Sequence, residues 1–134
     1  MPLLSHLDRS NGLPIRKSRP VRYEKTRPGE LVHVDIKKLG RIPDGGGHRV
    51  LGRAAGARSK RNGRGYAYIH HAVDDHSRLA YSEILNDERK ETAASFWERA
   101  RAFFAAAGVE VTAVMTDNGS CYRSATFAAA LSGI

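Results

Sequence analysis

Residues 66–107 constrain the fold most, because they predict two strands, a tight turn and a long amphipathic helix in close succession. Residues 66–73 and 79–85 are rich in β-branched and aromatic side chains, and residues 74–78 between them have the polar composition of a turn. In residues 91–107, apolar side chains recur at spacings of three and four residues, which predicts a helix with one apolar face. These residues therefore predict an antiparallel hairpin that a helix can cover.

Further strands are predicted at residues 31–36 and 109–115, and a second helix at residues 125–131. In the first of these strands, apolar residues alternate with His33 and Asp35, so the strand has one apolar and one polar face. The order is three strands, a helix, a strand and a helix. This order predicts an α/β protein with an RNase H-like fold, in which helices flank a mixed sheet, although other α/β folds share parts of the order.

Positive charge is concentrated in the first half of the chain. The 134 residues carry a net charge of +8, residues 31–65 contribute nine Lys or Arg against two acids, and residues 66–134 are net acidic. An asymmetry of this kind indicates a polyanionic partner, most often nucleic acid. Residues 1–29 contain four prolines and seven basic residues, which predicts an extended basic arm, and residues 30–134 are expected to form the folded core.

Residues 37–65 are predicted to form a basic insertion, because they contain eight glycines and only one acid. Two interpretations stay open: a solvated loop, or a hairpin that grips DNA phosphates and releases counterions. We favour DNA contact. The predicted DNA-binding residues are Lys37, Lys38, Arg41, Arg49, Arg53, Arg58, Lys60, Arg61 and Arg64.

Several other classes of protein do not fit the sequence. A single cysteine, Cys121, excludes an internal disulfide and a cysteine-rich zinc site. No run of apolar residues is long enough to span a membrane, and no glycine motif for a nucleotide cofactor is present. We therefore expect a cytoplasmic protein with neither a membrane partner nor a small-molecule cofactor.

Asp35 and Asp117 are the candidate metal ligands. Asp35 lies in the first predicted strand and Asp117 directly follows the fourth, 82 residues later. If these strands pair, the two carboxylates meet, and oxygen ligands of this kind suit Mg²⁺. The alternative is that Asp35 is a surface residue and that Asp117 caps a turn with Asn118 and Gly119; for Asp117 both can hold.

Other polar residues are not assigned a catalytic or metal-binding role. Asp74 and Asp75 are interpreted as turn residues. His70 and His71 are expected to point to opposite faces of their strand, so they cannot share one metal. His33 shares a face with Asp35 but is interpreted as an ordinary sheet histidine.

Three segments resemble bacterial insertion-sequence transposases of the DDE type. Residues 33–40 resemble their first-aspartate segment, and residues 73–78 are similar to the turn between their second and third strands. Residues 116–120, Thr-Asp-Asn-Gly-Ser, resemble their second-aspartate motif, which retroviral integrases share. The segments occur in the family order, and the resemblance extends from about residue 28 to residue 134.

The resemblance implies that Asp35 and Asp117 are the first two catalytic, metal-binding carboxylates, with Mg²⁺ or Mn²⁺ as cofactor. The third family ligand is a glutamate, and no Asp or Glu follows Asp117. We therefore expect a C-terminally truncated core fragment of a transposase that acts in DNA integration, with little or no activity alone.

The resemblance also implies partners and a place in the cell. Transposon-end and target DNA are the expected partners, together with full-length transposase or a second copy of the chain. The expected location is the bacterial cytoplasm, on the nucleoid when bound to DNA. The alternative function is a non-catalytic module that binds nucleic acid or the transposase.

Overall fold

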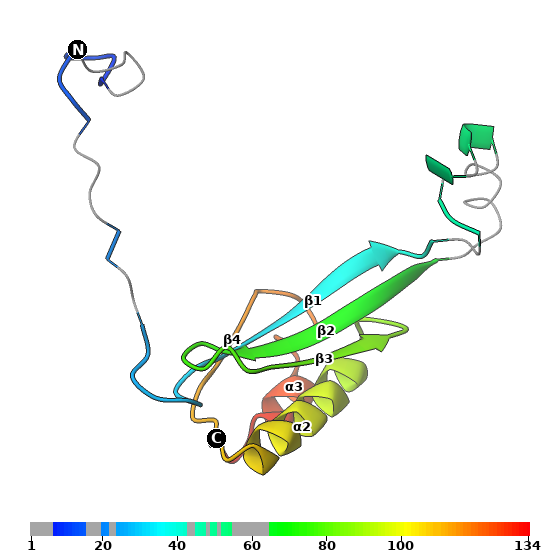
Figure 1. Cartoon of the computed structure of the whole chain (residues 1–134). Helices are drawn as coiled ribbons and strands as arrows, with labels where there is room; N and C mark the ends of the chain where they lie inside the picture. The colour runs from blue at the N-terminus through cyan, green and yellow to red at the C-terminus, as the bar shows by residue number, and fades with distance from the viewer. Residues whose placement is uncertain are drawn as a thin grey trace.

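The computed structural model describes residues 7–15, 20–21, 24–42, 45–47, 49–50, 52–54 and 65–134. The elements follow in the predicted order: β1 (Val32–Gly40), β2 (Tyr66–Asp74), β3 (Ala80–Leu85), α2 (Lys90–Ala106), β4 (Val114–Thr116) and α3 (Ala125–Ala130). Figure 1 shows the two helices on one side of the sheet. In the described part of the chain, no helix is long and apolar enough to cross a membrane.

The sheet has four strands in the order β3-β2-β1-β4. β1 pairs antiparallel with β2, and β2 with β3, whereas β4 lies parallel to β1. The sheet is therefore mixed, as predicted. A central β1 that contacts both an antiparallel and a parallel neighbour is what brings distant parts of the sequence together.

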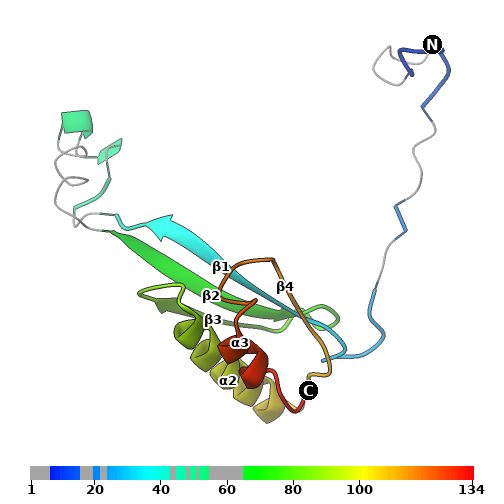
Figure 2. The ribbon, with the colours of Figure 1, turned by 180° about the vertical axis from the view of Figure 1, so that it is seen from behind.

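β1 and β2 form a longer hairpin than the sequence indicates. Their pairing runs from Val32 opposite Asp74 to Gly40 opposite Tyr66, so residues 37–40 continue the strand instead of starting the insertion. Side chains become more exposed toward Gly40 and Tyr66. In Figures 1 and 2 this end of the hairpin projects past the helices, and it leads to the insertion.

β4 is shorter than the predicted strand 109–115. Val109 and Val111 are buried in the core, but they belong to the connection from α2. The N–H of Thr112 donates to the carbonyl of Gly29 (2.8 Å), so this segment bonds to the chain before β1. The apolar residues at these positions therefore reflect burial in the core and not a strand.

One face of the sheet packs on α2 and α3. Val32, Val34 and Ala72 meet the helix side chains, which include Trp97 and Phe104. The predicted apolar stripe consists of Ala93, Trp97, Ala100, Phe104 and Ala107. Ala107 instead lies in the C-cap and is exposed, while Phe96, outside the stripe, is fully buried. Gly108 follows with a φ of +77°, a conformation that suits glycine at a helix end.

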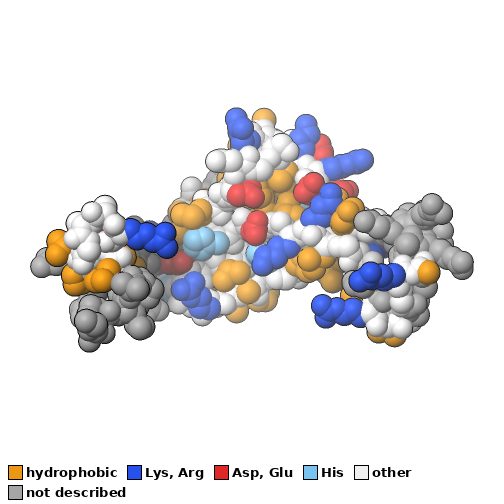
Figure 3. Space-filling view, turned by 90° about the horizontal axis from the view of Figure 1, so that it is seen from above, with side chains coloured by type: hydrophobic (Ala, Val, Ile, Leu, Met, Phe, Trp, Pro, Cys, Tyr) orange, Lys and Arg blue, Asp and Glu red, His pale blue; other side chains and the backbone are white. Residues whose placement is uncertain are grey.

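The other face is not covered by any helix of the described residues (Figure 2). The sheet register places His33, Asp35, Lys37 and His71 on this face. Met115 and Ile84 are half or more exposed, and their registers place them on the same face. Seen from above, charged and histidine side chains mix with apolar ones (Figure 3).

Asp74 is fully buried at the end of β2 and links separate segments. Its Oδ2 accepts hydrogen bonds from the N–H and hydroxyl of Ser77, which makes the predicted turn. Its Oδ1 accepts from the N–H of Gly29 (2.8 Å). A side chain at Gly29 would collide with the carbonyl of Glu110, so glycine is required at this junction.

We predict that Asp74→Ala lowers the free energy of unfolding by about 3 kcal/mol, because it leaves buried donors of Gly29 and Ser77 without a partner. Urea unfolding followed by the fluorescence of Trp97, the only tryptophan, measures the loss. Asp75→Ala is the matched control and should cost less, since Asp75 is partly exposed. An equal loss in both variants would contradict the assigned role.

We also predict an acid-sensitive contribution from Asp74. Burial alone would raise the pKa of this carboxyl, but the hydrogen bonds from Ser77 and Gly29 outweigh burial and hold the pKa below its usual 3.8. The stabilisation is therefore complete above about pH 4 and is lost as the pH falls through the folded-state pKa. Acid unfolding curves should converge for wild type and Asp74→Asn at the lowest pH; a constant difference would contradict this.

Candidate functional site

Asp35 lies in the middle of β1, on the face that no described helix covers. Its side chain is 45% exposed, and its Oδ2 lies 3.6 Å from Nε2 of His71, the residue opposite it in β2. His33 occupies the same face but turns away from Asp35, with Nε2 3.0 Å from Oδ1 of Asp75. Asp35 therefore presents an open carboxylate with one imidazole beside it.

Asp117 directly follows β4, which pairs parallel with β1. The parallel pairs are Val32 with Val114, His33 with Met115 and Val34 with Thr116. They end one residue before Asp35 and Asp117. The strand pairing on which a shared site depends is therefore present, and the shared site itself stays a prediction.

The turn after Asp117 holds this carboxylate in place. Oδ1 of Asp117 accepts a hydrogen bond from the N–H of Gly119 (2.8 Å), so the capping interpretation also holds. A Cβ at Gly119 would lie 2.8 Å from that oxygen and 3.5 Å from the ring of Tyr122. The turn thus needs a glycine between the carboxylate and the aromatic ring.

Tyr122 lies beneath the site. Its hydroxyl is buried and has no hydrogen-bond partner among the described residues. Burial raises the pKa of Tyr122 strongly, and the negative charges of Asp35 and Asp117 raise it further. The hydroxyl therefore stays protonated, within the electrostatic influence of both carboxylates.

The site offers oxygen donors of the type that a hard divalent cation prefers. Asp35 and Asp117 are its carboxylates, and the strand pair that leads to them ends one residue before each. Among the described residues, however, no group of three or more His, Cys, Asp or Glu side chains is arranged to hold a metal ion. Asp35 and Asp117 thus have the oxygen ligands that Mg²⁺ or Mn²⁺ prefers, but the described residues do not form a complete metal site.

The histidine assignments are settled by the two faces of β2. His70 is fully buried on the helix side, where its Nε2 lies 2.9 Å from the carbonyl of Asp87, to which it donates. His71 faces Asp35 instead. The opposite orientations were predicted. The contact of His71 with Asp35 was not predicted. It depends on the register between β1 and β2, which cannot be inferred across the 25 intervening residues 41–65.

Five of the nine predicted DNA-binding residues lie in the described part of the chain, and all five are exposed. Lys37 and Lys38 are in β1, and Arg41 donates to Oδ1 of Asn86 (3.1 Å). Arg49 and Arg53 belong to the insertion. The other four, which lie outside the described residues, are Arg58, Lys60, Arg61 and Arg64.

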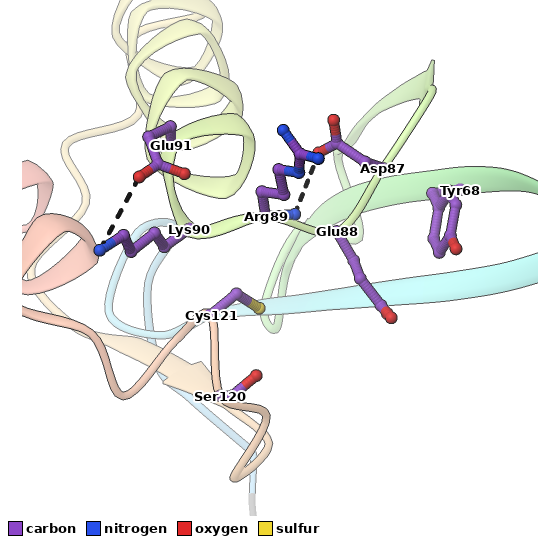
Figure 4. Close-up of a pocket in the computed structure, with 8 residues that line it drawn as sticks. All are labelled: Tyr68, Asp87, Glu88, Arg89, Lys90, Glu91, Ser120 and Cys121. Atoms are coloured by element: carbon purple, nitrogen blue, oxygen red, sulfur yellow. Dashed lines mark hydrogen bonds and ion pairs between the residues drawn. The ribbon is translucent and has the colours of Figure 1, made fainter.

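A pocket of about 470 Å³ lies between the hairpin, the start of α2 and the turn after Asp117. Figure 4 shows the Tyr68 ring and the Glu88 side chain opposite Ser120 and Cys121. Burial raises the pKa of the Cys121 thiol, and the negative charges of Asp117 and Glu88 act in the same direction. Both effects favour the protonated thiol.

Comparisons with known proteins agree with this geometry. Residues 25–133 match the family described as integrase core domain. The HTLV-2 integrase catalytic core domain, solved with magnesium in a trimeric form, has a TM-score of 0.54 and 15% identity over 76% of this chain and 52% of that chain. The simian T-cell lymphotropic virus intasome in complex with PP2A regulatory subunit B56 gamma has a TM-score of 0.58 and 18% identity, over 81% of this chain and 30% of that chain.

The chain spans about half the length of the integrase catalytic core domain that it matches. No curated protein matches the sequence. The structural likeness confirms the predicted RNase H-like fold, and the family match covers nearly all of the folded residues. The chain belongs to the integrase core domain family.

Proposed function

We propose that this chain is part of the catalytic core of a DDE transposase of the bacterial insertion-sequence kind, acting in DNA integration through metal-dependent strand cleavage and transfer. The observation that carries the proposal is the parallel pairing of β1 with β4, which ends one residue before Asp35 and Asp117. The family match and the magnesium complex of the HTLV-2 domain support it.

In this mechanism Asp35 and Asp117 would hold Mg²⁺ or Mn²⁺. A bound ion would activate the attacking oxygen or stabilise the leaving oxygen of a phosphodiester. His71 orients the Asp35 carboxylate from the neighbouring strand. Lys37, two residues beyond Asp35 on the same face, is placed to contact a DNA phosphate.

Having only two candidate carboxylate ligands limits the catalysis that the chain can perform alone. Two ions positioned for in-line displacement need more oxygen ligands than Asp35 and Asp117 supply. No Asp or Glu follows Asp117 in the sequence. We therefore infer that strand transfer by this chain alone is absent or very slow.

A second candidate function is a non-catalytic module that binds DNA or full-length transposase in the bacterial cytoplasm. The lack of a three-ligand group among the described residues favours it. The positive charge of residues 31–65 serves both functions, because phosphate contacts do not depend on catalysis. The two functions differ in whether the aspartates bind metal.

We predict weak, saturable Mg²⁺ or Mn²⁺ binding in a calorimetric or NMR titration. Asp35→Asn and Asp117→Asn should each weaken binding by at least about tenfold, or about 1.4 kcal/mol, because each removes a charged oxygen ligand. Loss in both variants would place the two carboxylates in one site.

Asp75→Asn is the matched control, since Asp75 lies on the same face but is hydrogen-bonded to His33. It should leave metal binding unchanged. No metal binding by a demonstrably folded chain, or equal loss in all three variants, would contradict the metal site and leave the DNA-binding module as the better function.

We also predict that the chain binds duplex DNA with an affinity that falls steeply with salt. Replacing Lys37, Arg49 and Arg53 with Gln should reduce the slope of log affinity against log salt by about 0.9 for each DNA phosphate that is no longer neutralised. Arg101→Gln is the control, because Arg101 instead donates to the carbonyls of Ser132 and Gly133. An unchanged slope in the triple variant would contradict DNA binding through these residues.

A further inference from the structure

Lys38, Tyr66 and Tyr68 form one exposed surface at the projecting end of the β1–β2 hairpin, here named the tyrosine–lysine surface. Lys38 is directly opposite Tyr68, and Gly40 is opposite Tyr66, so all three side chains lie on the same side of the sheet. The Lys38 ammonium is 4.5 Å from the centroid of the Tyr66 ring and 5.7 Å from that of Tyr68. A cation thus lies over two neighbouring aromatic rings.

This surface is not part of the hydrophobic core. Along this side of β2, His70 and Ala72 are fully buried, whereas Tyr68 is partly exposed and Tyr66 is 51% exposed. The hairpin here extends past the helices that cover the rest of this face (Figure 1). Core packing therefore does not account for two tyrosines at this end of the hairpin.

The pocket connects this surface to the turn after Asp117. Tyr68 lines one end of it, and Ser120 and Cys121, in the turn that follows Asp117, line the other (Figure 4). A ligand on the tyrosines that extends into the pocket therefore reaches the turn that holds Asp117. An extended chain of linked groups suits this arrangement better than a compact molecule does.

The charges in the pocket indicate whether charged or uncharged groups of such a ligand can enter the pocket. The carboxylate of Glu91 is paired with Lys90 (3.8 Å), and that of Asp87 accepts from the N–H of Arg89 (3.0 Å). Glu88 adds another carboxylate, whose charge reaches Cys121. Carboxylates repel phosphate groups, whereas an uncharged base can enter next to an aromatic ring.

We propose that the tyrosine–lysine surface binds unpaired nucleotides of single-stranded DNA. Bases stack on Tyr66 and Tyr68, Lys38 contacts the phosphates between them, and the strand continues into the pocket toward Asp117. Aromatic rings and basic side chains are the combination by which proteins hold single strands with little dependence on sequence. The proposal deepens the proposed DNA function, since it names the form of DNA that the hairpin binds.

The test compares three DNA ligands by fluorescence anisotropy at one salt concentration. They are a single-stranded oligonucleotide, an abasic strand of the same length, and a duplex. The chain should bind the single strand at least about tenfold more tightly than the abasic strand, because both carry the same phosphates and only one has bases to stack.

Tyr66→Ala combined with Tyr68→Ala should lower affinity for the single strand by about tenfold or more and leave abasic and duplex affinities unchanged. Tyr66→Phe combined with Tyr68→Phe keeps the rings and should retain binding. Leu39→Ala is the matched control, because Leu39 is 50% exposed on the same hairpin but on the opposite face. It should change none of the three affinities.

Equal binding of abasic and normal strands would overturn the proposal, as would the same loss in Leu39→Ala. If the double alanine variant does not fold, the comparison of the two strands with the wild-type chain decides the question by itself. Duplex binding is measured in the same series and tests the proposed DNA function separately. A chain that binds duplex but does not distinguish the two strands supports that function and contradicts this inference.

Discussion

The buried carboxylate of Asp74 fixes the point at which three segments of the chain meet. It binds the turn at Ser77 and the N–H of Gly29, and the carbonyl of Gly29 accepts from the N–H of Thr112. Thr112 precedes β4, and the N–H of Val32, at the start of β1, donates to Ala113 (2.9 Å). A chain of hydrogen bonds therefore leads from this buried acid to the start of the β1–β4 pair, where it supports the register of the two strands.

The proposed meeting of Asp117 and Asp35 depends on that register. β4 pairs with β1 over only three residues, so the ladder itself contributes few hydrogen bonds. In a parallel pair, a slip by one residue would move Asp117 away from the level of Asp35 and turn its side chain to the other face. The candidate metal site, on the open face of the sheet, thus depends on a contact at the opposite end of the strand pair.

The sequence was informative where a single element carries its own pattern. The alternation around Asp35, the stripe that includes Trp97 and the turn residues at Asp74 each reflect local physics, and the structure contains all three. What could not be predicted depends on pairing between distant segments. The contact of His71 with Asp35 follows from a register across a long insertion, and the shortness of β4 follows from the bonds of Gly29.

The distribution of charge explains why the hairpin and the candidate site depend on each other. Asp35 and Asp117 are both exposed enough to face a DNA phosphate, which two carboxylates repel unless a cation neutralises them. Lys37 and Lys38 begin the basic part of the chain two and three residues after Asp35, and they point to opposite faces of the same strand. Within a few residues, β1 therefore presents a carboxylate that repels phosphate and two lysines that attract it. In the proposed function, DNA would be held mainly by the hairpin and would approach the carboxylates closely only with a metal ion between them.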